Sequence, residues 1–258
     1  MPFVGKTWHR QSLWWLAVAA IAVLIKHHYS VATATDLEWI FHPLAMLLEL
    51  FTGHIFQQDN YGEWVSYSAN VRLVKACAGI NFMLMSFIAY AWVFRPDKQE
   101  NTNDLTHIMG QLLLISAAII AAWATCLLAN SLRIIIAMEA VSQHWELPSI
   151  GIDAKQLHRL IGMFIYIPFL SLQMTLGETK RKHSKALFIG PLLLYLILTV
   201  FVPLLTGNAL QHPKVFLEHV LFLVSTAACL TTTFVIAMSL KRFLSRTSTL
   251  ENTCHKQR

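Results

Sequence analysis

Four polar or reactive side chains lie where apolar runs meet polar segments, and together they could carry out acyl transfer. They are Cys77, Asn130, Arg133 and His158. A thiolate can attack a carbonyl carbon, and a histidine can protonate the leaving amine near neutral pH. The planar N–H groups of an arginine can stabilise the developing oxyanion or hold a substrate carbonyl. These residue types predict a cysteine nucleophile assisted by Arg133 and His158.

Cys77 stands where a charged segment changes into a long apolar run. At or just before the first turn of a helix, unpaired backbone N–H groups and the positive end of the helix dipole favour a thiolate. Arg72 and Lys75 add positive charge upstream. The small residues Ala76, Ala78 and Gly79 leave room for another chain to approach. A cysteine at a helix end can also be a small apolar packing residue. Position alone therefore leaves both interpretations of this thiol open.

The composition is that of a polytopic membrane protein. Of the 258 residues, 55% are hydrophobic and only 13% are charged, and the mean hydropathy is positive. The net charge of +6 comes from basic residues in short connections between apolar runs. This is the positive-inside pattern, without the basic stripe and interleaved aromatics typical of nucleic-acid binding. The four cysteines have neither CxxC nor metal-ligand spacing, so they predict no disulfide framework and no zinc site.

Six apolar runs predict an all-α membrane bundle in a single domain, residues 1–258. The predicted spans cover residues 13–25, 79–94, 108–129, 160–176, 187–205 and 216–239. Two further apolar runs are short for a bilayer, which takes roughly 20 residues to cross. Residues 37–52 are predicted to be re-entrant or interfacial, and residues 134–141 to form a short helix folded back at the outer surface. Residues 53–76 are predicted to form a loop outside the bilayer.

The distribution of basic residues predicts that both termini are cytoplasmic. Most of the 20 lysines and arginines fall in segments assigned to the inside, including residues 180–185 and the basic tail 241–258. A cleaved signal peptide is an alternative for the first run, because residues 32–34 look like a small-residue cleavage site. With an uncleaved first helix, this topology places all four candidate residues at the outer ends of spanning helices.

Each candidate residue also has a structural interpretation. Arg133 at a helix end can extend towards lipid phosphate, and Asn130 can cap a helix or lie in a loop. His158 is one of 12 histidines and can be an interfacial residue. Cys126 and Cys229 lie inside apolar runs, which predicts that they are packing residues.

Three short motifs, in this order along the chain, resemble those of the exosortase/archaeosortase family of polytopic membrane cysteine transpeptidases. They are Ala76-Cys77-Ala78-Gly79-Ile80, Asn130-Ser131-Leu132-Arg133-Ile134 and His158-Arg159-Leu160-Ile161-Gly162. The resemblance covers roughly residues 70–180. It implies that Cys77, Arg133 and His158 are catalytic and that Asn130 supports them. Ala78 departs from the family pattern, in which a serine is commoner, so a hydroxyl near the thiol is missing.

The resemblance implies a protein-sorting peptidase or transpeptidase of a prokaryotic cell membrane, with its active site at the extracytoplasmic face. Its substrates would be exported proteins with a C-terminal signal made of a short motif, a transmembrane helix and a basic tail. Cys77 would attack a carbonyl near the motif, Arg133 would stabilise the oxyanion or position the motif, and His158 would protonate the leaving amine. The resulting thioester would pass to an acceptor or to water. This chemistry needs no metal and no organic cofactor, and the partners are the substrates, the acceptor and membrane lipids.

Two other functional classes remain as alternatives. A non-catalytic transporter or channel is expected to have ionisable groups in mid-span or broken helices in paired halves, for which residues 37–52 and 134–141 are the nearest candidates. Another type of intramembrane hydrolase would carry His-Glu-x-x-His or Gly-x-Ser-x-Gly, and the sequence contains neither. Four histidines could form an outer metal site, although their spacing fits no common ligand pattern. They are His27, His28, His42 and His54.

Overall fold

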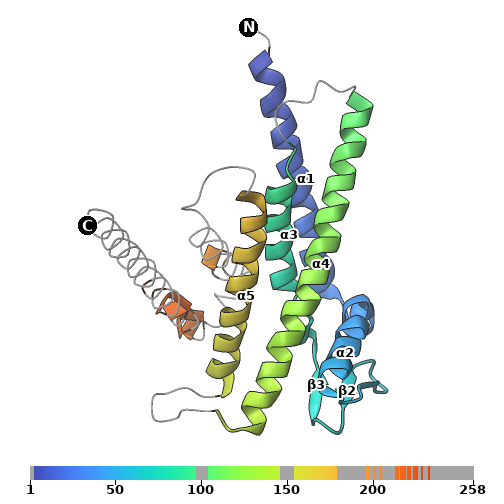
Figure 1. Ribbon diagram of the computed structural model, residues 1–258, viewed down its shortest axis with the longest axis vertical. Coiled ribbons are helices and arrows are strands. Elements are labelled where there is room, and N and C mark those ends of the chain that lie inside the picture. Colours follow the sequence, from blue (N-terminus) through green and yellow to red (C-terminus); the bar gives the residue numbers. More distant parts are fainter. Residues whose placement is uncertain are drawn as a thin grey trace, which may run out of the picture. The chain divides into compact units, whose positions relative to one another are not determined.

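The structure is a computed structural model that describes residues 3–96, 104–145, 154–178 and scattered positions between 196 and 232. The chain divides into two units, Met1–Pro191 and Leu192–Arg258, and the elements below belong to the first (Figure 1). In chain order they are α1 (Phe3–Val31), the 3-10 turn η1 (Thr35–Leu37), α2 (Glu38–Thr52), β1 (Gln57–Gln58), β2 (Trp64–Ser66), β3 (Val71–Leu73), the 3-10 turn η2 (Lys75–Ala78), α3 (Ile80–Phe94), α4 (Asp104–Ser142) and α5 (Ala154–Glu178).

Among the described residues, four helical segments are long and apolar enough to cross a membrane, which indicates a membrane protein. They are Gln11–Val31, Lys75–Phe94, Ile108–Ser142 and Gln156–Leu176. These segments contain the first four predicted spans. The two remaining predicted spans, residues 187–205 and 216–239, are described only at scattered positions.

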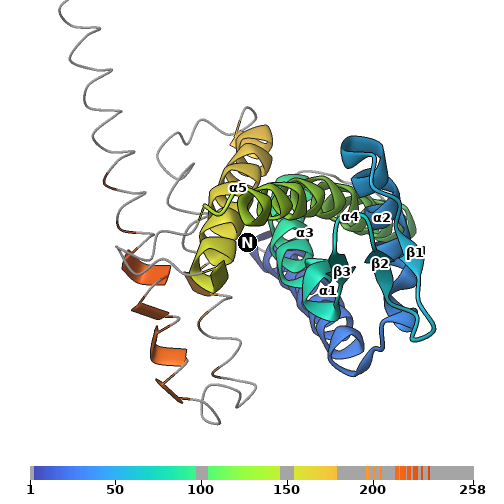
Figure 2. The same cartoon turned by 90° about the horizontal axis from the view of Figure 1, so that it is seen from below.

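Helix α3 is the centre of the first unit, where it packs against α1, α4 and α5 (Figures 1 and 2). The span that contains α3 is 56% buried, whereas that of α1 is only 11% buried. Large apolar side chains such as Leu16 and Leu24 are exposed on α1. Because exposed apolar side chains are favourable in lipid and unfavourable in water, most of α1 is suited to face acyl chains.

Helix α4 continues without a break to Ser142, so the prediction of a separate short helix over residues 134–141 is wrong. The chain has neither glycine nor proline between Cys126 and Ser142, and nothing in the sequence stops the helix there. The 39 residues of α4 span about 58 Å at 1.5 Å per residue. That length is roughly twice a hydrocarbon core, so α4 can extend beyond the membrane surface instead of folding back.

A small antiparallel sheet of three short strands lies within the predicted loop of residues 53–76. Strand β2 lies between β1 and β3, and Trp64 is opposite both Gln58 and Leu73. The guanidinium of Arg72 donates to the Glu63 carboxylate at 2.8 Å. Strands of two or three residues are too short to show an alternating pattern, which is why the sequence did not reveal them. The positive charge of Arg72 is therefore paired with the Glu63 carboxylate.

The predicted short apolar helix over residues 37–52 is present as α2, which packs against α4. The turn before it is closed by Asp36, whose carboxylate accepts from the backbone N–H of Thr33 at 2.8 Å and from its hydroxyl at 2.7 Å. These hydrogen bonds hold the pKa of Asp36 below its usual value because they stabilise the carboxylate. The turn orients α2 relative to α1.

Lys75 ties the turn η2 to the end of α1. Its ammonium donates to the carbonyl oxygens of Ser30 at 3.0 Å and Ala32 at 2.8 Å. The Tyr29 hydroxyl donates in return to the carbonyl oxygen of Lys75 at 3.1 Å. The last carbonyls of a helix lack partners within the helix, so a cation there is stabilising. Lys75 therefore anchors the turn that carries Cys77, and its positive charge is directed at α1.

Candidate functional site

Cys77 lies in η2, just before α3, as the sequence predicts. Its backbone N–H donates to the carbonyl oxygen of Val74 at 2.6 Å, and its side chain is partly exposed. Gly79, two residues later, has a φ of 70° and is the N-cap residue that precedes α3. Glycine adopts this left-handed conformation without the steric cost of a Cβ atom. The chain can therefore turn sharply from the thiol into the central helix.

The space beside Gly79 is filled by α4. A Cβ atom at Gly79 would lie 3.0 Å from Cγ of Asn130 and 3.1 Å from Sγ of Cys126. The Cys126 thiol donates to the carbonyl oxygen of Gly79 at 3.4 Å and is completely buried. The prediction that Gly79 leaves room for another chain is wrong, because α4 of the same chain occupies that room. Cys126 is a packing residue, as predicted, whereas Cys229 lies outside the described residues.

Asn130 connects the Cys77 turn to α5. Its Nδ2 donates to the carbonyl oxygen of Cys77, and its Oδ1 accepts a hydrogen bond from the Tyr166 hydroxyl at 3.0 Å. The side chain is 1% exposed. Because Asn130 lies inside α4, its predicted place at a helix end and its interpretation as a helix cap are both wrong. A buried amide that uses both its donor and its acceptor fixes the relative positions of η2, α4 and α5.

Arg133 lies one turn beyond Asn130 on the same face of α4. Like Asn130, it is inside the helix and not at its end. Its Cζ is 5.5 Å from the centre of the Tyr166 ring, and its Cδ is 3.6 Å from the position that a Cβ atom would take at Gly162. Its Nε and Nη2 atoms are buried and have no hydrogen-bond partner in the described part of the chain. Such donors are available to an acceptor atom of a substrate, and they are costly if left unpaired.

His158 lies on the face of α5 that meets Arg133. His158, Gly162 and Tyr166 are spaced by four residues, so they follow one another along one face of the helix. Gly162 and Tyr166 both lie against Arg133, and His158 is one turn closer to the start of α5. The His158 side chain is exposed and interacts electrostatically with Arg133. Within the described residues, no hydrogen bond joins His158 to Cys77.

The structure therefore brings together Asn130, Arg133 and the backbone of Cys77, and it places His158 next to this group. The sequence did not predict the residue that connects them, Tyr166. Its ring stacks on Phe82 of α3 with centroids 4.2 Å apart. A signal was present in the sequence, because Tyr166 follows His158 by two four-residue steps and therefore lies on the candidate face of the helix, and a buried hydroxyl needs a partner.

Replacing Tyr166 by phenylalanine is expected to lower the free energy of unfolding by about 1–2 kcal/mol, because Oδ1 of buried Asn130 loses its donor. The ring contacts with Phe82 and Arg133 would remain. Tyr90→Phe is the matched control, since it removes a hydroxyl that pairs with Thr125 at 2.9 Å between α3 and α4. Thermal unfolding in detergent measures both variants. An unfolding midpoint of Tyr166→Phe equal to wild type would contradict a role for this hydrogen bond.

No three histidine, cysteine, aspartate or glutamate side chains in the described ranges gather in a way that could hold a metal ion. The four histidines considered for an outer metal site are all described, and they form no such group. No family model, curated protein or solved structure matches the chain.

Proposed function

We propose that this protein is a membrane-embedded cysteine peptidase or transpeptidase of the exosortase/archaeosortase type. Cys77 is the nucleophile, Arg133 and His158 are its catalytic partners, and Asn130 supports the site. The proposal rests on the resemblance of three sequence motifs and on one structural observation. That observation is the hydrogen-bonded connection from the Cys77 carbonyl through Asn130 to Tyr166, whose ring lies against Arg133.

This connection is better explained by a functional site around Cys77 than by a cysteine that only fills space. A packing cysteine needs apolar neighbours only, whereas here buried polar groups of three separate elements are joined next to the thiol. Buried polar groups are costly unless they are paired, and the cost is greater where water is absent. Arg133 adds two buried donors that no described residue uses. An arginine buried inside a spanning segment also fits a transporter or channel, but the hydrogen bond from Asn130 to the Cys77 turn favours the peptidase.

In the proposed mechanism the Cys77 thiolate attacks a peptide carbonyl of the substrate. A carbon–sulfur bond forms, and the carbonyl oxygen takes up negative charge that the free N–H groups of Arg133 stabilise. The tetrahedral intermediate then collapses and the carbon–nitrogen bond breaks, while His158 donates a proton to the leaving amine. An acceptor amine, hydroxyl or water next attacks the thioester and returns the thiol. Asn130 holds the backbone of the nucleophile during both steps.

The proposed substrates are exported proteins that carry a C-terminal signal of a short motif, a transmembrane helix and a basic tail. The finer topology is also part of the proposal, with about six spans, both termini in the cytoplasm and the site at the outer face of a prokaryotic cell membrane. A substrate helix that emerges from the bilayer would then present its cleavage motif to Cys77. Helix α4, which is longer than a bilayer core, can provide Arg133 near that surface.

The experiment that tests this function detects the covalent intermediate. The full chain is co-expressed with an epitope-tagged substrate bearing such a signal, and tagged protein that migrates with the enzyme is isolated under denaturing conditions. We expect a tag-bearing adduct that hydroxylamine releases and that peptide mass spectrometry locates on Cys77. Continued processing after complete alkylation of the Cys77 thiol would exclude the cysteine mechanism.

The proposed outer location makes a separate prediction. A membrane-impermeant maleimide is expected to label Cys77 in intact cells, because its side chain is partly exposed next to the predicted outer surface. Cys254, in the basic tail predicted to be cytoplasmic, is expected to react only after permeabilisation. Mass spectrometry identifies which cysteine is labelled, and variants that lack one of the two cysteines confirm the assignment. Labelling of Cys254 in intact cells would contradict the topology without bearing on the nucleophile.

A further inference from the structure

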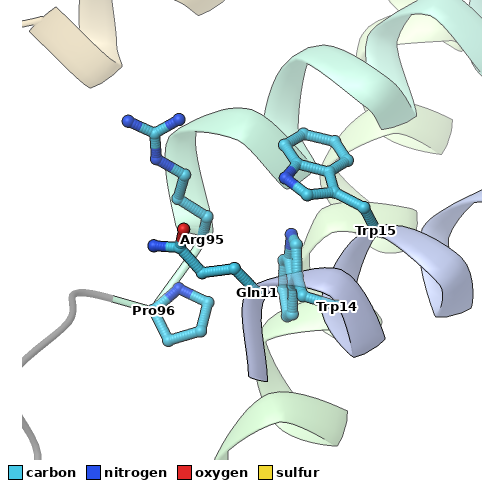
Figure 3. A pocket seen from close by; sticks show the side chains of 5 residues that line it. All are labelled: Gln11, Trp14, Trp15, Arg95 and Pro96. Carbon is cyan, nitrogen blue, oxygen red and sulfur yellow. The ribbon is translucent and has the colours of Figure 1, made fainter. Parts of the chain in front are cut away.

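A cavity lies at the end of α3 opposite to Cys77, between that end and α1 (Figure 3). Its volume is about 220 Å³. Its lining residues are Gln11, Trp14, Trp15, Arg95 and Pro96. None of them is acidic, and two of them carry amide or guanidinium N–H donors. The cavity is therefore suited to a ligand that is rich in hydrogen-bond acceptors.

Trp14 provides the strongest indication of a ligand. Its side chain is 2% exposed, and its Nε1 atom is buried without a hydrogen-bond partner among the described residues. An indole N–H can only donate, so it needs an acceptor. In Figure 3 the Trp14 ring stands at the cavity, and the Gln11 amide extends towards Arg95. A ligand oxygen would satisfy this buried donor.

Two neighbouring tryptophan rings support the cationic side of the cavity. The Cζ of Arg95 is 4.1 Å from the centre of the Trp92 ring, and that ring is 6.0 Å from the ring of Trp15. The contact between a guanidinium and an aromatic face limits the positions that the arginine can take. Arg95 therefore carries a positioned positive charge at the cavity, which favours an anion.

The position of the cavity relative to the membrane indicates which type of anion could bind there. The apolar run of α1 begins at Leu13, two residues after Gln11, and Phe94, which precedes Arg95, is the last residue of the span that contains α3. The two ends meet at the cavity, so it lies at the depth where acyl chains give way to headgroups. Tryptophan and arginine are enriched at this interface. The acceptor-rich anion found there is phosphate.

We propose that this cavity binds a phosphate ester. The phosphoryl oxygens accept hydrogen bonds from the Trp14 indole and the Gln11 amide and pair with the Arg95 guanidinium. The site is non-covalent and independent of the proposed peptidase function, because it lies at the other end of α3 from Cys77. A phospholipid headgroup and a soluble phosphate ester share this chemistry, and the experiment distinguishes them.

The test uses the purified full chain in a neutral detergent and measures binding by native mass spectrometry. The probes are a short-chain phosphatidylglycerol, the diacylglycerol with the same chains, and glycerol phosphate. We expect phosphatidylglycerol to bind and the diacylglycerol not to bind. Trp14→Phe removes the N–H and keeps the ring, and it is expected to weaken binding about five- to tenfold, with a larger loss for Arg95→Gln. Trp145→Phe is the control, since Trp145 lies beyond α4 and is exposed.

Equal binding of phosphatidylglycerol and diacylglycerol would overturn the proposal, because the phosphate would then contribute nothing. Unchanged binding in both Trp14→Phe and Arg95→Gln would overturn it as well. Glycerol phosphate that binds as tightly as the lipid would support the site and assign it to a soluble ester. If Trp14→Phe does not fold, Gln11→Leu decides, since this side chain is less buried and its loss is expected to weaken binding by a similar factor.

Discussion

Cys77→Ala is expected to lower processing of a signal-bearing substrate on the order of a thousandfold or more, while the protein still inserts and folds. The substitution removes the atom that forms the thioester, and no neighbouring group can replace it. The cost to folding is small because the side chain is only partly buried and its backbone contacts with Val74 and Asn130 remain. Quantitative immunoblotting of the cleaved and uncleaved substrate measures the effect.

The control for this prediction follows from the structure. Considered from sequence alone, Cys126→Ala should have little effect. The Cys126 thiol, however, lies 3.4 Å from the carbonyl oxygen of Gly79, so its removal leaves space directly behind the Cys77 turn. Cys254→Ala is the better control, because Cys254 belongs to the predicted cytoplasmic tail. Processing by Cys77→Ala at the wild-type rate would return the transporter and other-hydrolase hypotheses to consideration.

Gly79→Ala is expected to destabilise the protein by about 2–5 kcal/mol and to displace the Cys77 turn. The left-handed backbone costs an alanine about 1–2 kcal/mol. The added methyl group would also meet Asn130 at 3.0 Å and Cys126 at 3.1 Å, and overpacking of this kind costs about 1–3 kcal/mol more. Thermal unfolding in detergent measures the loss of stability, and the processing assay measures the displacement.

Gly53→Ala separates the two contributions. Gly53 has a φ of 71°, almost the same as Gly79, but a Cβ atom there would meet nothing within 4 Å. We expect Gly53→Ala to show the backbone cost alone and to leave processing unchanged. Equal destabilisation by the two substitutions would show that the contact between η2 and α4 is less tight than these distances indicate.

The main helices could be predicted from sequence because apolar composition over about 20 residues is a strong signal. Their ends could not, and α4 is the clearest case. Arg133 and the polar residues around it suggested the end of a span, but a helix with no breaker continues wherever its polar side chains find partners. Asn130 finds partners in Cys77 and Tyr166. The small sheet was missed because strands of two or three residues have no readable period.

The candidate site was predictable as a set of residues but not as an arrangement. Residue type and order indicated Cys77, Arg133 and His158. The contacts that position them depend on tertiary packing, which a single sequence does not specify. Two examples are the Tyr166 hydrogen bond to Asn130 and the close approach of Asn130 to Gly79. The positive charges expected to act on the thiol are instead engaged by Glu63 and by the end of α1.

The attachment of the Cys77 turn to α1 links the site to the thickness of the bilayer. The α1 span is only 11% buried, so most of it is suited to face lipid. Lys26 nevertheless donates to Asn81 at 2.7 Å, and Lys75 donates to the carbonyl oxygens of Ser30 and Ala32. A helix whose apolar length does not match the membrane adjusts by tilting. Tilting of α1 would pull on η2 while Asn130 holds it to α4 from the other side. We therefore expect the geometry around the thiol to vary with acyl-chain length, because α1 would transmit its tilt to η2.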